Sequence, residues 1–378
     1  MQSQGNTLGP KLRAEEVERV LGHIFTRNDR VEEAGRRGVP LCIWGSHGLG
    51  KTEMVKQYAA ARRWKFAYCA PAQFEEMGDL HGMPTVHDPT PSTPASGDEY
   101  TVFAPPEWVP KEAGPGILLL DDINRADDRI LRGIMQLLQN FEMLSWQLPP
   151  RWQIVATANP DGADYSVTPM DDAMLTRMLH LTLVFDPFSW ARWAVASKVD
   201  GRGIDFVLHY PESVTGRRTT PRTLTYFFEQ IAEIADLKSD KDTVAVLAAS
   251  CLDDTTAAAF LAFVNDDLAL LPTPVQILAS QSPAEWRTRV DRLAAGEGGA
   301  KRVDRIAAIC TRLFLHVSAA GYTPGPNDKT NFAEFMCMQT IPNDLRASML
   351  LDLAKQPSTA VREFIKDKRL AQLFLAKL

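Results

Sequence analysis

The sequence lacks the features that mark a membrane or secreted protein. No apolar run approaches the roughly 20 residues that a membrane-spanning helix needs. The first residues, MQSQGN, do not form the basic and then apolar segments of a secretory signal. We therefore expect a cytoplasmic protein with a short frayed N-terminus and no membrane partner.

Cysteine is scarce, and positive charge is not in excess. The five cysteines are an odd number, widely spaced, with no CxxC pair and no His at metal-ligand offsets, so we expect reduced core thiols. The formal net charge of -6 argues against a broadly basic surface, although a local basic channel could coexist with it. We find no helix-turn-helix, zinc finger or aromatic-basic stretch. A nucleic-acid partner is therefore disfavoured.

What the chain does have is length and a change of pattern at its middle. The 378 residues are enough for two or three folding units. In the first half, short β-rich apolar runs alternate with helical patterns, which predicts an α/β core with a parallel sheet covered by helices. The expected strands are residues 39–44, 65–70, 117–120, 153–158 and 179–184.

From about residue 186 the strands stop and Ala/Leu-rich helical patterns take over, for example at 255–264 and 303–317. The second half is predicted to be all helical. Its Met- and Phe-rich stretch 332–338 is assigned to packing before partner binding. Within the first half, residues 85–110 are rich in Pro, Ser and Thr, which predicts an irregular, mobile surface insertion.

One motif carries specific chemistry. Residues 45–52 read GSHGLGKT and fit GxxxxGK[ST] at every fixed position, between an expected strand and a helical pattern at 53–62. Glycines let the backbone curl so that its N–H groups surround phosphate oxygens, and the helix N-terminus adds a positive dipole end. A chance match is expected in on the order of one chain in a hundred of this size, and the strand-helix context lowers that figure.

The motif predicts a P-loop that binds ATP with Mg²⁺. Lys51 would reach the β- and γ-phosphates, and the Thr52 hydroxyl would ligate Mg²⁺. His47 has no fixed role in the pattern and is interpreted as loop filler. The predicted nucleotide-binding residues are Gly45, Ser46, His47, Gly48, Leu49, Gly50, Lys51 and Thr52.

A second motif follows at residues 117–122, where the apolar run ILLL ends in Asp121 and Asp122. Alone, such a run is common and a solvated turn would be the better interpretation. After a P-loop it reads as a Walker B strand, with Asp121 in the Mg²⁺ shell and Asp122 orienting and deprotonating the attacking water.

Residues 121–126, DDINRA, resemble the Walker B segment of the MoxR group of AAA+ ATPases, which normally reads DEINRA. Residues 78–84, 103–110 and 146–152 are similar to further segments of this group, the last to the hairpin that precedes its sensor 1 strand. The resemblance covers about residues 8–271. It implies a P-loop AAA+ core at 1–186 and an all-helical lid at 187–271. The residues beyond it, 272–378, are predicted from their helical patterns to form a C-terminal extension.

The resemblance also implies three further site residues. Asn159, in VATANP, would be the sensor 1 amide that positions the hydrolytic water, against the alternative of a plain Asn-Pro turn. Arg177, in DAMLTRM, would be the arginine finger offered to a neighbouring subunit, against the alternative of a surface Arg at a helix end. Arg222, in TTPRT, would be a sensor 2 contact to the γ-phosphate, with Arg217 and Arg218 as nearby cations.

By the same resemblance, the chain would form a homo-oligomeric ring, expected to be a hexamer. It would hydrolyse ATP to remodel or assemble a protein client, for which a von Willebrand factor A (VWA) domain protein is a candidate. Asp122 stands where the group has Glu, which withdraws the carboxylate by about one methylene. A slow nucleotide switch or scaffold therefore stays open, and a nucleic-acid motor ranks below it. Asn124 and Arg125 could support Walker B in the same chain or contact an adjacent subunit.

Overall fold

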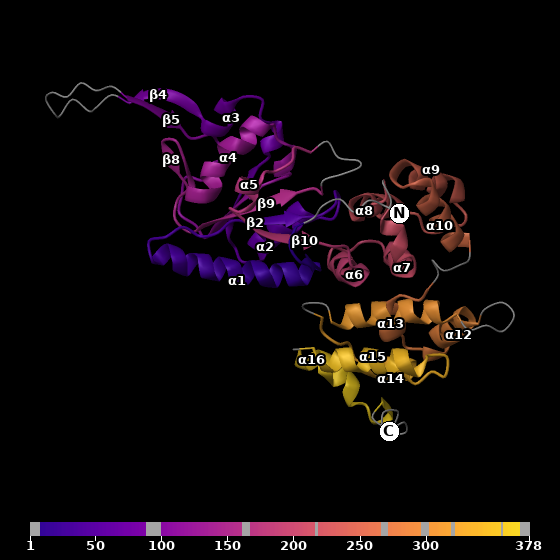
Figure 1. Cartoon of the computed structure of the whole chain (residues 1–378). Coiled ribbons are helices and arrows are strands. Elements are labelled where there is room, and N and C mark those ends of the chain that lie inside the picture. The colour runs from indigo at the N-terminus through magenta and orange to yellow at the C-terminus, as the bar shows by residue number, and fades with distance from the viewer. Residues whose placement is uncertain are drawn as a thin grey trace. The chain divides into compact units, whose positions relative to one another are not determined.

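A computed structural model describes residues 8–87, 100–160, 167–215, 218–265, 271–295, 302–318, 322–356 and 358–370. The chain divides into two compact units, Met1–Asp186 and Pro187–Leu378 (Figure 1). Among the residues in these ranges, no helix is long and apolar enough to cross a membrane.

The first unit is built on a six-stranded parallel sheet with the order β1-β10-β2-β9-β6-β3. This arrangement confirms the predicted α/β class and all five predicted strands. Patterning missed the sixth strand, β1, because two residues are too few to show a period. The strands are β1 (Lys11–Leu12), β2 (Leu41–Trp44), β3 (Lys65–Cys69), β6 (Gly116–Leu120), β9 (Trp152–Ala158) and β10 (Leu179–Leu183).

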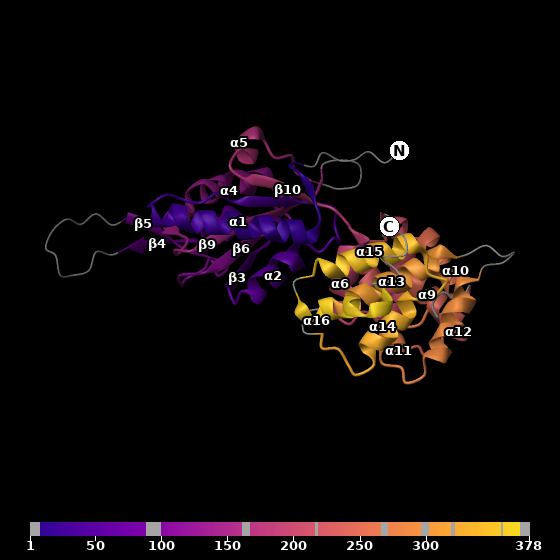
Figure 2. The same cartoon turned by 90° about the horizontal axis from the view of Figure 1, so that it is seen from below.

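Helices cover both faces of this sheet (Figures 1 and 2). On one face, α1 (Ala14–Glu33) and α2 (Lys51–Ala61) pack with strand residues such as Ile43 and Leu119. On the other, α4 (Asp128–Asn140) packs with alternate strand residues such as Leu118. The continuous apolar runs of the central strands follow from this burial on both sides.

Residues 85–110 differ from the predicted irregular insertion. β4 (Met83–His87) and β5 (Tyr100–Ala104) pair as an antiparallel ribbon, because β-branched and aromatic residues outweigh the local prolines. The Pro- and Ser-rich stretch 88–99 lies outside the described residues. A second hairpin, β7 (Glu142–Met143) with β8 (Trp146–Gln147), precedes β9 as predicted, but it overlaps the predicted segment 146–152 only in β8.

The described part of the first unit also contains short helical segments. They are α3 (Met77–His81), which precedes β4, η2 (Ile123–Arg125), which follows β6, and α5 (Asp172–Leu175), which precedes β10. A further 3-10 turn, η1 (Pro71–Gln73), follows β3.

Helices make up the regular elements described in the second unit, as predicted. The patterns at 255–264 and 303–317 correspond to α10 (Asp254–Asn265) and α13 (Val303–Val317). The others are α6 (Pro187–Ala196), α7 (Gly201–His209), η3 (Pro211–Thr215), α8 (Pro221–Ile231), α9 (Lys241–Cys251), α11 (Pro274–Leu278), α12 (Pro283–Ala294), α14 (Asp328–Met336), α15 (Asn343–Ala354), α16 (Thr359–Arg362) and η6 (Glu363–Lys366). Phe332, Phe335 and Met336 are fully buried, which confirms their assignment to packing.

A buried ion pair joins α7 to α13 within this second unit. Arg312 donates to Asp205 over 2.6 Å, and both side chains are buried. Burial raises the pKa of Asp205 to about 7, although the neighbouring guanidinium lowers it. The pair ties a helix of the predicted lid to a helix of the predicted extension, and the proposed boundary at 271/272 stays a prediction.

The cysteines are free thiols, as the spacing predicted. Cys42, Cys69 and Cys310 are buried in the cores, while Cys251 and Cys337 are only partly buried. Burial raises the pKa of all five thiols, most strongly for the three in the cores, so they stay protonated near neutral pH.

Candidate functional site

The candidate site lies where three parallel strands end. The register pairs Trp44 of β2 with Ala158 of β9, and Leu120 of β6 with Ala156 of β9. Loop 45–50, the acids after β6 and Asn159 after β9 therefore leave the sheet at the same carboxyl edge. In open α/β sheets this edge is where ligands bind.

The loop before α2 has the geometry of an anion cradle. Gly48 and Gly50 adopt left-handed backbone conformations, with φ of 72° and 84°. A Cβ at Gly50 would meet no atom within 4 Å, so the backbone conformation and not space demands glycine there. Gly50 is also the N-cap of α2, and no side chain caps the helix. The N-terminal dipole of α2 is thus open to an anion.

Lys51 is held inside this loop, with its side chain almost fully buried. Its ammonium donates to the Gly45 carbonyl over 2.7 Å, to the Ser46 carbonyl over 3.2 Å and to Asn159 Oδ1 over 3.1 Å. All three acceptors are neutral oxygens. They place the positive charge between the loop and the end of β9, where a phosphate could replace them as the stronger, charged acceptor.

Asp121 gathers hydroxyl groups from three elements. Its Oδ1 accepts from Thr52 Oγ1 over 2.7 Å and from Thr157 Oγ1 over 2.6 Å. Its Oδ2 accepts from the Tyr68 hydroxyl over 3.1 Å. A hydroxyl and a carboxylate oxygen this close are hard ligands of the kind that Mg²⁺ takes. The residues present therefore fit the metal that the motif implies.

Asp122 stands in a left-handed conformation with φ of 47° and ψ of 45°, which is uncommon outside glycine but better tolerated by Asp. Its amide donates to Thr157 Oγ1 over 2.8 Å, and its Oδ1 accepts from Asn159 Nδ2 over 2.9 Å. Arg125 Nε lies 3.5 Å from its Oδ2. The structure thus brings Asp122 together with the predicted sensor Asn159, and it places Arg125 beside Asp122 of the same chain.

Asn124 lies behind this pair and is fully buried. Its Nδ2 donates to the Asn159 carbonyl over 2.8 Å, and its Oδ1 accepts from the Asn159 amide over 3.0 Å. In the described structure Asn124 therefore supports the site within one chain. Sequence reasoning left its role open, and it missed Tyr68 and Thr157 as partners of Asp121. Thr157 could have been found from its position in β9, two residues before Asn159, because residues two apart in an extended chain point to the same side.

The two predicted arginines are on different units of the chain. Arg177 follows α5 in the first unit and donates to Gln139 of α4 over 3.0 Å and to the Ala173 carbonyl. Arg222 is in the first turn of α8 in the second unit, after an N-cap by Thr220 with Pro221 at the first turn. The Arg177 bonds described here are to Gln139 and Ala173 and not to the P-loop. The roles of both arginines stay predictions.

Of the two nearby cations, Arg218 is engaged within the second unit. Its backbone amide donates to Asp253, and its guanidinium donates to the carbonyls of Ala249 and Ser250. Arg217 lies outside the described residues.

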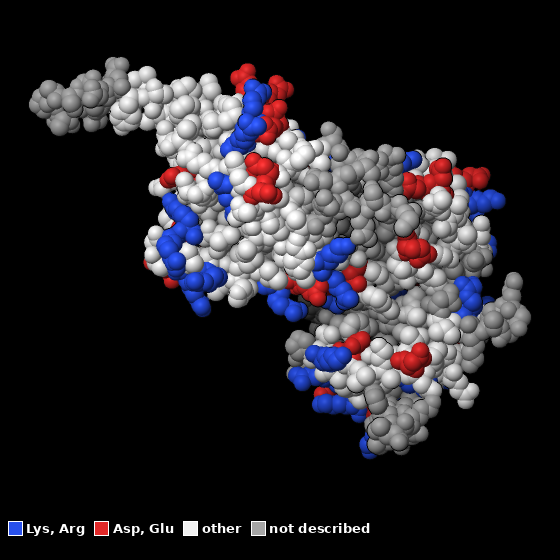
Figure 3. Space-filling model, viewed as in Figure 1, with Lys and Arg blue, Asp and Glu red and all other residues white. Residues whose placement is uncertain are grey.

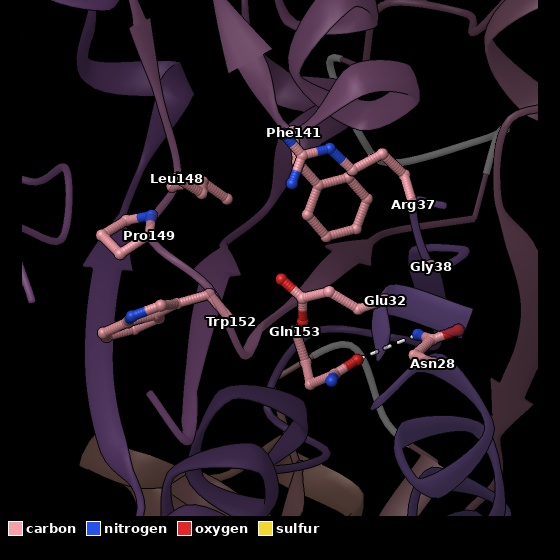
Figure 4. A pocket seen from close by; sticks show the side chains of 9 residues that line it. All are labelled: Asn28, Glu32, Arg37, Gly38, Phe141, Leu148, Pro149, Trp152 and Gln153. Carbon is pink, nitrogen blue, oxygen red and sulfur yellow. Dashed lines mark hydrogen bonds between the residues drawn. The ribbon is translucent and has the colours of Figure 1, made fainter. Parts of the chain in front are cut away.

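A small cavity occupies the opposite, amino edge of the sheet (Figure 4). It measures about 10 Å³, which is room for about one water molecule and not for a nucleotide. Its lining residues are Asn28, Glu32, Arg37, Gly38, Phe141, Leu148, Pro149, Trp152 and Gln153.

Charges are mixed on the molecular face shown in Figure 3, where basic and acidic side chains are interspersed. Positive groups on this face form small clusters and not one continuous basic field. This pattern agrees with the formal net charge of -6.

Comparisons with known proteins agree with the motifs. A Rhodococcus erythropolis protein described as an ATP-dependent protease ATP-binding subunit-like protein is 28% identical over 103 residues. That match spans 27% of this chain and only 29% of the relative.

Among solved structures, the chain is similar to two mutant forms of Thermotoga maritima RuvB, at 13% and 14% identity with TM-scores of 0.39 and 0.40. These alignments cover 78% of this chain in both cases, and 88% and 87% of the RuvB chains. At these scores we draw nothing about function from the likeness.

A family match locates the site within a defined domain. Residues 40–178 match the family described as the AAA domain of the dynein-related subfamily. The matched range contains the P-loop, both acids after β6, Asn124, Asn159 and Arg177. The candidate site therefore lies within the part of the chain that is similar to this family.

Proposed function

We propose that this protein binds ATP with Mg²⁺ at the carboxyl edge of its sheet and hydrolyses it. The observation that carries the proposal is the convergence of Lys51, Asp122 and Asn159 in one hydrogen-bonded chain beside an uncapped helix N-terminus. Lys51 and the loop amides bind the triphosphate, and Thr52 with Asp121 would hold the metal. When bound, Mg²⁺ supplies positive charge that offsets the charge developing on the phosphoryl oxygens.

The chain's own residues then position the attacking water. Asp122 carries a carboxylate that accepts the proton of this water, and Asn159 holds that carboxylate through its Nδ2. Asp122 is short, but Asn159 fixes one of its oxygens and Arg125 stands near the other. This support favours a working base over a passive scaffold.

We further propose that the protein works as a homo-oligomeric ring of the MoxR type, as a hexamer, and remodels a protein client. The AAA domain and the 121–126 segment support this assignment, and a VWA-domain protein is the candidate client. Arg177 would complete a neighbour's site and Arg222 would sense the γ-phosphate from the lid. A slow nucleotide switch is the second candidate, favoured by Asp in place of Glu at 122.

The test of nucleotide binding is Lys51→Ala with Lys65→Ala as the matched control. Removing a buried charged contact costs about 3 kcal/mol, so the affinity for MgATP should fall roughly 100-fold, as calorimetry would show. Lys65 is exposed and pairs with Glu112 on the surface, so its removal should leave binding unchanged. Wild-type protein that releases no heat with MgATP would overturn the proposal.

Arg177→Ala tests the ring. Nucleotide affinity should stay as in wild type while turnover falls by about 10³-fold or more, because an arginine finger acts only on the transferring phosphoryl group. Arg129→Ala is the control, since Arg129 is exposed on α4 and pairs with Asp127 of the same chain. Wild-type turnover in Arg177→Ala would refute the finger assignment. Stimulation of ATPase by DNA at low salt would instead favour a nucleic-acid motor.

A further inference from the structure

Asn159 follows the last residue of β9 that pairs with a neighbouring strand. The ladder between β6 and β9 ends at the pair Leu120 and Ala156, and the ladder between β2 and β9 ends at Trp44 and Ala158. Asn159 is the next residue, and it is fully buried. Its N–H and C=O groups therefore need partners that no neighbouring strand pair supplies, since a buried backbone group left unpaired is costly.

Asn124 supplies both partners with one side chain. Its amide oxygen faces the Asn159 N–H and its amide nitrogen faces the Asn159 carbonyl, at 3.0 and 2.8 Å. Only one orientation of the amide satisfies both bonds, because the carboxamide has one accepting and one donating end. The side chain thus acts as a substitute strand for a single residue, which we call the Asn124 clamp.

The clamp is itself fixed. The carbonyl of Asn124 accepts from the Thr168 amide over 2.8 Å, and the Thr168 hydroxyl donates to the Ala126 carbonyl over 2.8 Å. Asn124 also belongs to the short helix that begins directly after Asp122. One rigid segment therefore carries the acid at 122 and the group that sets the backbone of Asn159.

We propose that Asn124 is a positioning residue that holds Asn159 at the distance from Asp122 and Lys51 which ATP hydrolysis requires. This inference rests on the proposed function, because it assigns the clamp to that site. The Asn159 side chain spans from Lys51 to Asp122 and has no freedom to drift while its backbone is clamped. A displacement of about 1 Å in such a positioning group can cost roughly 100-fold in rate.

The same chain offers a matched control at the other edge of the sheet. Asn28 donates to the Val39 carbonyl over 3.0 Å and accepts from the Val39 amide over 3.0 Å, and Val39 lies just before β2 begins. This Asn28 clamp is also buried and makes the same pair of bonds to one residue. It differs in that Asn28 also donates to Gln153 Oε1 over 2.9 Å, and in having no link to the P-loop cluster through the bonds described.

The experiment compares Asn124→Ala with Asn28→Ala in the nucleotide-free protein and in turnover. Hydrogen exchange should show about one newly exchanging amide at Asn159 in Asn124→Ala and at Val39 in Asn28→Ala, because each variant removes one acceptor. Turnover should fall roughly 100-fold in Asn124→Ala alone, with affinity for a nonhydrolysable ATP analogue within about threefold of wild type. Asn124→Asp keeps the acceptor for the Asn159 amide but loses the donor to the Asn159 carbonyl, so it should keep that amide protected and recover only part of the turnover.

Three outcomes would overturn the inference. Asn124→Ala could turn over ATP at the wild-type rate, or both variants could lose turnover equally. Exchange could also rise through 116–120 as well as at Asn159, which would make Asn124 a general support of the sheet. If Asn124→Ala does not fold, Asn124→Leu, which has the same shape but neither the donor nor the acceptor, carries the same test. Failure of wild-type protein to bind MgATP would sink the proposed function and leave the exchange result unaffected.

Discussion

The two edges of the parallel sheet both carry buried amide side chains, but these side chains have different partners. At the amino edge, Asn28 and Gln153 are bonded to each other and enclose a cavity of about 10 Å³ beside Trp152 (Figure 4). At the carboxyl edge, Asn159 is bonded to a lysine and an acid, next to a helix end that no side chain caps. At the amino edge these amides are bonded to each other, whereas bonds at the carboxyl edge can be exchanged for bonds to a ligand.

The strand β9 runs between these edges and allows the sharpest test of the difference. Asn159→Ala removes the amide that holds Asp122, so turnover should fall by about 10²- to 10³-fold, as for other donors in preorganised sites. Gln153→Ala, at the other end, removes bonds to Asn28 and Asp29. It should lower the free energy of unfolding by about 1–3 kcal/mol and leave turnover unchanged.

Steady-state ATPase assays and urea unfolding of both variants give the two readouts. The comparison between the edges fails if Gln153→Ala slows turnover as much as Asn159→Ala does. It also fails if Asn159→Ala keeps wild-type turnover, because the carboxyl edge would then have no more chemical role than the amino edge.

Asp122→Glu tests whether the Asp122 carboxylate is already well placed for ATP hydrolysis. The longer side chain gains reach towards a water, but it must give up the present contact with Asn159 at 2.9 Å. We expect turnover to change by less than about tenfold, which is under about 1.4 kcal/mol in the barrier. Single-turnover measurements with saturating MgATP check this. A much larger gain would show that Asp122 serves a slow switch.

The sequence predicted the candidate site residues that belong to local motifs. The P-loop, Asp121, Asp122 and Asn159 were predicted, and the structure brings Lys51, Thr52, both acids and Asn159 into one cluster. The strands were predictable because burial on both faces gives continuous apolar runs. The prediction of irregular structure at 85–110 was wrong for 85–87 and 100–104, which lie in paired strands, since prolines obscured the β pattern there.

The missed residues act through geometry that no local pattern encodes. Tyr68 reaches Asp121 only because β3 pairs with β6, a neighbour relation that depends on the strand order. Asn124 lies within a recognisable motif, but its proposed positioning role depends on where two strand ladders end. Such roles follow from long-range register, which local sequence patterns do not reveal.

Tyr68→Phe should give the smallest effect, because it removes one hydrogen bond to an acid that keeps two others. Burial and the nearby Asp121 raise the pKa of Tyr68 to about 12, so its hydroxyl stays protonated and donates to Asp121 near neutral pH. A bond of this kind contributes about 1 kcal/mol, so the Mg²⁺ concentration for half-maximal ATPase should rise about fivefold with maximal turnover retained. Tyr226→Phe, an equally exposed tyrosine in the second unit, should not shift this concentration. An unchanged Mg²⁺ requirement in Tyr68→Phe would mean that Thr52 and Thr157 suffice to orient Asp121, and that strand β3 adds nothing to the carboxyl edge.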